Sequence, residues 1–254
     1  MISEQQLITL GFKFGKNGAH AARSMMNEEL KLLFSVHGAN ATKEQYEHAI
    51  VDGNILHKPT TNSRKLTYRH LLDLYSLDSS VVIFRQFRGY WALDEKAQDV
   101  LALQLAIARD PLLRASSEVI LGLDLGERLT RESMEAFLAK DDPTRFSPAS
   151  LKSFAQNING TWTQAGYLVG RSKKLRDEPR LSYVNVAFAL YLAHCHGLSG
   201  QRMFDSYWCK LLSDNKQVLL DLAHRASLHG LIRFKQVSEI IEVTFPQEQR
   251  QQGN

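Results

Sequence analysis

The sequence predicts a mainly α protein, a helical bundle that contains helix-turn-helix or winged-helix-like units and one or two short β-hairpins. Apolar residues recur at spacings of three and four along most of the 254 residues, as on the buried face of an amphipathic helix. Near the end, an apolar helix over Lys216 to Leu228 is followed by Gly230 and two strand-like runs, LIRFKQVS and IIEVTFP. A similar outline follows Ser147, and a lone hairpin needs a helix to rest on.

The first elements predict helices joined by turns. From Ala19 to Val36 the apolar spacing is helical, and we expect this helix to stop at Gly38, a residue suited to a left-handed end. A second helix is expected behind Thr42, where Gln45 completes a capping box. A third helix, Ser63 to Tyr75, places its leucines on one face, so the pattern is that of a helix-turn-helix.

The middle of the chain, from about Ser79 to Lys140, predicts further helices that form the scaffold of the bundle. Breaks are expected near Asp94, at Asp110 before a proline, and at Gly126. Thr130 is suited to cap the helix that follows. Mixed charges and apolar faces in this region are typical of bundle architecture.

The clearest break in the chain is the DDP sequence at 141–143, so we expect two domains. Residues 1–142 are expected to form an N-terminal helical domain with a helix-turn-helix, and residues 143–246 a C-terminal helical domain with two winged-helix-like ribbons. Ser147 followed by a proline is a strong helix start. Two further helices are expected over Tyr183 to His196 and Gln201 to Leu212. The glutamine-rich residues 247–254 are expected to be a disordered tail.

Composition narrows the class of protein. The net charge of +4 is modest, so the clustering of positive residues matters more than their number. The longest apolar run is far shorter than the roughly 20 residues that a spanning helix requires, so we expect no membrane role. Cys195 and Cys209, in a chain with no predicted secretory leader, are expected to be reduced thiols in a cytoplasmic protein.

The first basic cluster lies at the start of the third predicted helix, with no carboxylate until Asp73. It comprises Lys58, Arg64, Lys65 and Arg69. A helix N-terminus offers unpaired N–H donors and a favourable dipole to a phosphate, and in a helix-turn-helix this would be the recognition helix. The alternative is a solvated basic face.

The second basic cluster follows the LVG run and is expected to lie between the two strands of the first ribbon, LVG and LSYV. It comprises Arg171, Lys173, Lys174, Arg176 and Arg180. A hairpin tip with five positive side chains can lie along phosphates, and Lys152 on the preceding helix extends the surface. The alternative is a charge-rich turn that only favours solubility.

No catalytic signature is evident. The glycines of GFKFGKNG lack the spacing of a phosphate loop. His194, Cys195 and His196 are neighbours on a predicted helix and point in different directions, so they cannot share one metal ion. No serine or cysteine lies in a nucleophile motif. We therefore expect no enzymatic activity, no catalytic residues, no cofactor and no metal.

The pattern of apolar positions from about Ala19 to Val169 is similar to that of a known family. Its pieces are NILHKPTTNSRKLTYRHLLDLYSL, VLALQLAIARDPLLRASSEVIL, TRESMEAFL and SPASLKSFAQNINGTWTQAGYL, with a DPLLR turn and an AGYL exit. The chain resembles the BrxA family of bacteriophage-exclusion (BREX) defence systems. The resemblance implies a mainly helical, non-enzymatic DNA-binding protein with helix-turn-helix units, encoded beside a methyltransferase, a large ATPase and a phosphatase-like protein. The region after Leu181 extends beyond the family pattern.

Two hypotheses of function follow. In the first, the protein is a double-stranded DNA-binding component of a phage-defence system, and the two basic clusters contact phosphates. In the second, it is an adaptor that docks on other defence subunits, such as the methyltransferase, the ATPase or the phosphatase-like protein, without touching DNA. Binding that weakens as salt is added separates the first from the second.

Overall fold

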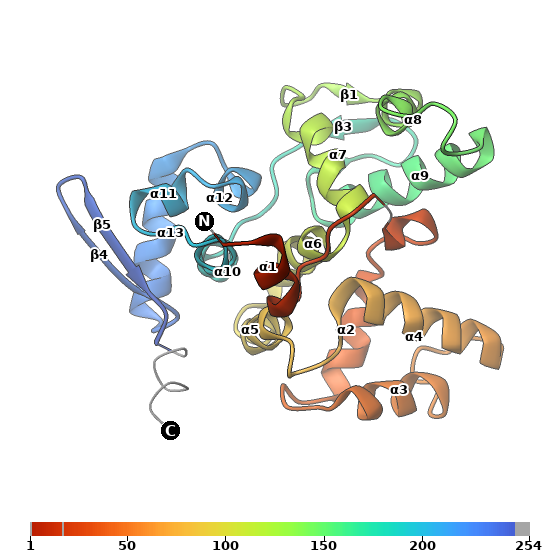
Figure 1. The fold of residues 1–254 in the computed structure, drawn as a ribbon, viewed down its shortest axis with the longest axis horizontal. Helices are drawn as coiled ribbons and strands as arrows, with labels where there is room; N and C mark the ends of the chain where they lie inside the picture. The colour runs from red at the N-terminus through yellow and green to blue at the C-terminus, as the bar shows by residue number, and fades with distance from the viewer. Residues whose placement is uncertain (1, 17, 247–254) are drawn as a thin grey trace.

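A computed structural model describes residues 2–16 and 18–246 of the chain, which form a mainly helical fold with small antiparallel sheets (Figure 1). The predicted disordered tail, 247–254, lies outside the described residues. In chain order the elements of the first half are α1 (Glu4–Leu10), the 3₁₀ helix η1 (Ala19–Ala21), α2 (Asn27–Val36), α3 (Lys43–Val51), α4 (Thr61–Tyr75), α5 (Val82–Trp91), the 3₁₀ helix η2 (Glu95–Ala97), α6 (Gln98–Arg109) and α7 (Pro111–Leu121). The second half contains β1 (Arg128–Leu129), α8 (Arg131–Ala139), α9 (Pro148–Gln164), β2 (Leu168–Val169), β3 (Lys174–Arg176), α10 (Tyr183–Cys195), α11 (Gln201–Phe204), α12 (Tyr207–Leu212), α13 (Lys216–Leu228), β4 (Arg233–Val237) and β5 (Ile240–Thr244).

The first predicted helix is interrupted. Ala19 to Val36 was expected to be one helix, but η1 and α2 are separated by a segment in which Met26 has a left-handed backbone, with φ of 54°. The backbone of Met25 is bound by two side chains from elsewhere: its N–H donates to Thr161 Oγ1 and its carbonyl accepts from Tyr75 Oη. These tertiary hydrogen bonds replace the helical ones. The helix α2 then ends at an extended His37 and not at a left-handed Gly38.

The helix α3 forms with the predicted capping box, and α4 starts at a second capping box that was not predicted. The side chain of Thr42 accepts from the backbone N–H of Gln45, whose own side chain accepts from the backbone N–H of Thr42. In α4 the corresponding pair is Thr60 and Ser63, so the helix starts two residues before the predicted position. Each capping box satisfies N–H groups that the first helical turn leaves unpaired.

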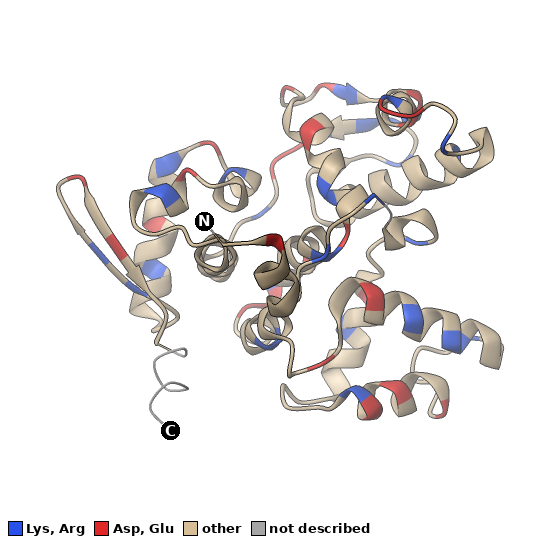
Figure 2. Ribbon diagram, in the orientation of Figure 1, with Lys and Arg blue, Asp and Glu red and all other residues tan. Residues whose placement is uncertain are grey.

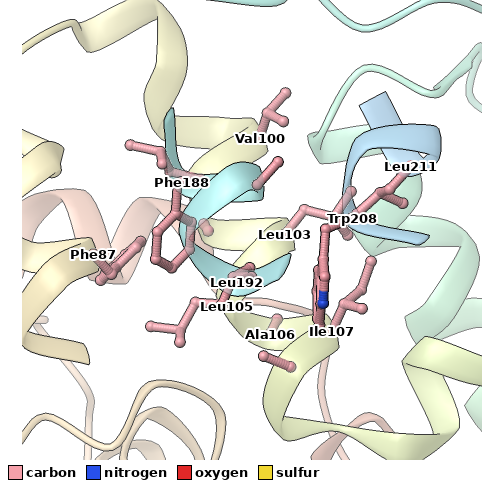
Figure 3. Packing of buried hydrophobic residues seen from close by; sticks show 14 of the residues in the cluster. Phe87, Val100, Leu103, Leu105, Ala106, Ile107, Phe188, Leu192, Trp208 and Leu211 are labelled. Atoms are coloured by element: carbon pink, nitrogen blue, oxygen red, sulfur yellow. The ribbon is translucent and has the colours of Figure 1, made fainter. Parts of the chain in front are cut away.

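The core is built on α6 and α10. Every residue of α6 from Val100 to Arg109 is buried, and so is every residue of α10 from Val184 to Ala193. A helix that is buried on all sides needs neighbours on all sides. Figure 3 shows these neighbours: Phe188 of α10 faces Phe87 of α5, and Trp208 of α12 packs beside Ile107 of α6.

The predicted first ribbon exists, with its second strand in a different place. Strand β2 pairs with β3, so that Val169 lies opposite Leu175. The LSYV run, expected to be a strand, is the start of α10, because Ser182 and Asn185 form a capping box there. The prediction was wrong on this point, and Lys174 and Arg176 therefore lie within a strand and not in the loop.

An unexpected strand, β1, completes the sheet, whose order is β1-β3-β2. It lies just after Gly126, where only a break was expected, and Arg128 pairs with Leu175. The helices α8 and α9 also pack together. Hydrogen bonds and helix packing thus join residues on both sides of the expected domain boundary at 142/143.

The last unit follows its predicted outline closely. The predicted helix Tyr183 to His196 forms as α10, and the predicted helix Lys216 to Leu228 forms as α13. The predicted helix Gln201 to Leu212 is divided into α11 and α12, because Ser206 caps a new helix start. The second predicted ribbon is the hairpin β4–β5, in which Val237 pairs with Ile240 across a two-residue turn.

Three features are absent from the described residues: a membrane-spanning helix, a metal-binding cluster and a disulfide bond. Within residues 2–16 and 18–246, none of the helices has the length and apolar character to cross a bilayer. The same ranges contain no group of three or more His, Cys, Asp and Glu side chains placed to hold a metal ion. Both cysteines are buried and unbridged, and burial raises the pKa of the Cys209 thiol to about 12.

Candidate nucleic-acid interface

The first basic cluster divides into two residues that are exposed and two that stabilise the fold. Lys65 and Arg69 are exposed on α4, one turn apart, and neither side chain has a hydrogen bond or ion pair among the described residues. Lys58 is partly buried and its Nζ lies 2.9 Å from Glu29 Oε1. The guanidinium of Arg64 donates to the backbone carbonyl of Val51, the last residue of α3, at 3.2 Å. Lys58 and Arg64 therefore hold α2, α3 and α4 together.

A residue that sequence reasoning missed extends this surface. Arg23 is exposed in the segment between η1 and α2, which was expected to be the interior of a helix. Burial lowers the pKa of His70 on α4, and the positive charge of Arg23 lowers it further, followed by that of Arg69, against the opposing charge of Asp73. These interactions place Arg23 near the basic side of α4. Figure 2 shows the contrast between the basic residues of α4 and the acidic residues of α3.

The second basic cluster is also divided. Arg171 and Lys173 are exposed in the loop between β2 and β3 and have no polar side-chain partner among the described residues. Lys174 Nζ donates to the carbonyl of Gly170 at 2.9 Å, and burial lowers its pKa. The guanidinium of Arg176 donates to the carbonyls of Tyr167 and Asp177. Lys174 and Arg176 thus hold the turn that presents Arg171 and Lys173.

A polar pocket of about 590 Å³ lies beside this loop, where β1, the start of α8, and α9 meet. Its lining includes Arg128, Gln156 and Arg171. Arg128 is exposed and was not predicted, because only the pairing of β1 with β3 brings it beside the loop. Lys152 is exposed one turn before Gln156 on α9, so it extends the same helix face outward.

Arg180 does not belong to this loop. It precedes α10 and lines a separate pocket with Lys96 and Arg225, so its expected position on the hairpin tip was wrong. The exposed cations named above, apart from Arg180, form two groups, one on α4 with Arg23 and one around the β2–β3 loop with α9. The 3₁₀ helix η1 contacts both α4 and α9, and it lies between them in Figure 1.

A buried network fixes η1 in this position. His20 Nδ1 lies 2.8 Å from Asp110 Oδ2, and His20 Nε2 lies 2.7 Å from Thr161 Oγ1. In the neutral tautomer of His20 that carries its hydrogen on Nδ1, the Nδ1–H group donates to Asp110, and the hydroxyl of Thr161 donates to Nε2 while its oxygen accepts from the N–H of Met25. A carboxylate, an imidazole and a hydroxyl in contact in this order are also found in the catalytic triads of hydrolytic enzymes. All three side chains are fully buried, so no substrate reaches them and their role is to join η1, α7 and α9.

Burial opposes the ionisation of Asp110, but hydrogen bonds from the His20 ring and from backbone N–H groups outweigh it and hold its pKa below its ordinary value. Its Oδ1 also accepts from the N–H groups of Leu112 and Leu113, at the start of α7. The carboxylate therefore stabilises both the helix start and η1.

Comparison of the chain with protein-family models and with curated protein sequences finds no match.

Proposed function

We propose that the protein is a non-enzymatic DNA-binding component of a bacterial phage-defence system of the BREX type, which contacts duplex phosphates through exposed basic residues. The observation that carries the proposal is the element order α7, β1, α8, α9, β2, β3 with sheet order β1-β3-β2. A winged helix consists of three helices with a strand after the first and a hairpin after the third. The resemblance to the BrxA family supports the same function.

In this proposal α9 is the recognition helix and the β2–β3 loop is the wing. The exposed face of α9 carries Lys152, Ser153 and Gln156, which are side chains able to contact phosphates and base edges. The wing carries Arg171 and Lys173 with no competing carboxylate partner among the described residues. The same chemistry on α4, at Lys65 and Arg69, extends the proposed contact along the duplex.

The test is the affinity for a short duplex, measured by fluorescence anisotropy over a series of salt concentrations. Each neutralised phosphate adds roughly 0.9 to the slope of log K against log salt. We expect Arg171→Glu with Lys173→Glu to lower the affinity at least tenfold and to flatten the slope by about two. Wild-type binding that is absent at low salt, or indifferent to salt, would overturn the proposal.

A matched control uses the same change of charge elsewhere. Lys43 on α3 and Lys210 on α12 are exposed and lie outside the proposed surface. The variant Lys43→Glu with Lys210→Glu is expected to keep the wild-type slope. An equal loss in both double variants would point to net charge alone and would remove the wing from the site.

A second function, as an adaptor that docks on another defence subunit, is favoured by the hairpin β4–β5. At its tip Val237 is 73% exposed and Ile240 is 76% exposed, and exposed apolar pairs are typical of docking surfaces. In contrast to the β2–β3 loop, the turn between them carries Glu239 and no cation. Val237→Ser with Ile240→Ser, which changes no charge, is expected to leave duplex affinity unchanged. If wild-type protein binds no duplex, the adaptor function replaces the first proposal.

A further inference from the structure

The pocket that Arg180 lines is small, about 230 Å³, and three cations from separate segments converge on it. Lys96 comes from η2, Arg180 from the segment before α10, and Arg225 from α13. All three are exposed, and none of their side chains has an ion pair or hydrogen bond within residues 2–16 and 18–246. Positive charges gathered in one pocket repel each other, so an anion bound there would lower the free energy of the folded chain.

The acidic residue in the same pocket does not neutralise them. Asp94 Oδ2 accepts the hydroxyl proton of Ser182 at 2.6 Å, and its Oδ1 accepts the backbone N–H of Lys96 at 3.0 Å. Its oxygens are thus directed to hydrogen-bond donors at the start of η2 and α10. The three cations against this single carboxylate leave the pocket positive.

We propose that this pocket is a binding site for a phosphate group. A phosphate fits because its charge and several acceptor oxygens match donors that approach from different sides. The first residues of α10 also line the pocket, and the N-terminal end of this 13-residue helix adds a positive dipole. The proposal does not depend on duplex binding by α9 and the wing.

The walls of the pocket are already fixed. The ring of Tyr183 at the start of α10 stacks on His229 at the end of α13, with centroids 4.3 Å apart. Asn185 Nδ2 donates to the carbonyl of Ala97 at 2.9 Å, which ties α10 to η2. When the walls of a site are already held in place, the free-energy cost of ordering them on anion binding is smaller.

The experiment is a titration of ¹⁵N-labelled protein with inorganic phosphate, at constant ionic strength maintained with chloride. We expect saturable shifts at the amides of Ser182 and Val184. Arg180→Gln with Arg225→Gln removes both positive charges but keeps unbranched, polar side chains, and it is expected to weaken phosphate binding at least tenfold. Arg202→Gln, an exposed arginine on α11 outside the pocket, is the control and is expected to bind phosphate as the wild type does.

Two results would overturn the proposal: no saturable shift in the wild type, or unchanged phosphate affinity in the double variant. If the double variant loses its fold, judged by its amide spectrum, Lys96→Gln alone provides the same test. If Lys96→Gln binds phosphate as tightly as the wild type, the proposal is likewise overturned. It is also overturned if phosphate causes no shift at the amides of Ser182 and Val184 in the wild type.

Duplex titrations identify the source of the phosphate. If the backbone of DNA supplies it, the double variant flattens the salt slope by one to two, about one for each lost contact. If a free phosphate compound supplies it, the slope is unchanged while phosphate binding is lost. The wing variant Arg171→Glu with Lys173→Glu is expected to bind inorganic phosphate normally, so failure of the duplex proposal is distinguishable from failure of this one.

Discussion

Asp110 shows how one side chain can join two segments that are far apart in the sequence, η1 and the start of α7. Its carboxylate accepts hydrogen bonds from the backbone and ring of His20 and from two N–H groups at the start of α7. The sequence shows an aspartate before a proline, which predicts a helix cap and nothing more. Its partner His20 lies 90 residues earlier, and no local pattern indicates that distance.

Asp110→Asn is expected to lower the free energy of unfolding by about 3 kcal/mol, because the new amide places N–H donors against the donors of His20. Asp124→Asn, at an exposed turn, is the matched control and should change stability by less than about 0.5 kcal/mol. Denaturant unfolding at pH 7 measures both. Equal stability of the two variants would contradict the role given to Asp110.

The pH dependence of stability follows from the same residue. The pKa of Asp110 in the folded protein is below its ordinary value of 3.8, so the unfolded chain takes up the proton first as the pH falls. The stabilisation is therefore complete above pH of about 5 and is lost as the pH falls through the folded pKa. We expect the difference in stability between wild type and Asp110→Asn to shrink between pH 5 and pH 2. A constant difference over this range would contradict the linkage.

Sequence reasoning was least complete for the charged residues. Lys65, Arg69, Arg171 and Lys173 are exposed as the surface hypothesis requires, whereas Lys58 is paired with Glu29. A sequence gives the sign and order of charges but not which backbone carbonyl or carboxylate each one meets after folding.

At the scale of elements, local signals predicted well where they did not compete with tertiary contacts. The capping box at Thr42 and the end of α13 at Leu228 required only neighbours in sequence. The strand β1 has two residues and gains its hydrogen bonds from β3, almost 50 positions away, so it gave no local signal. The LSYV run was misread because its alternating apolar residues resemble a strand, while Ser182 starts a helix.

The wing turn depends on Gly170, whose φ of 94° disfavours side chains and whose added Cβ would collide with the carbonyl oxygen of Lys173. We expect Gly170→Ala to lower stability by about 1–3 kcal/mol and to weaken duplex binding, because the wing must rearrange. Gly126→Ala is the control, since Gly126 has φ of 80° with open space around it. Thermal unfolding and anisotropy measure the two effects. Identical losses in both variants would show that backbone strain alone is responsible.

For the whole molecule, the decisive feature is one core to which helices from both halves of the described chain contribute. The helices α6 and α10 contact each other and α5, and α6 also contacts α4, α7 and α9. Both helices are almost continuously apolar, which is typical of helices buried on all sides. This composition does not predict which helices cover them, because every amphipathic helix in the chain presents a suitable face. The boundary at 142/143 was expected from a local break in the sequence, but strands β1 and β3, which lie on opposite sides of that break, pair in one sheet.

Phe188→Ala tests this shared core. The side chain is fully buried between Phe87 and Tyr90, so its removal leaves a cavity and is expected to cost about 3–5 kcal/mol. Leu228→Ala is the control, because Leu228 is 88% exposed and its removal should cost less than about 0.5 kcal/mol. We expect fluorescence and circular dichroism to follow one common transition in both. Two separate transitions would contradict a single core.

Because Cys195 and Cys209, the only cysteines of the chain, are both buried, we expect the native protein to react only slowly with thiol reagents. The rate of labelling with a chromogenic disulfide is therefore limited by local opening of the structure. That rate measures how often the region around α10 and α12 opens. The same low reactivity of the natural thiols in the native state allows a dye to be attached at one chosen residue. Ser172→Cys on the wing would carry it without any need to remove the natural thiols.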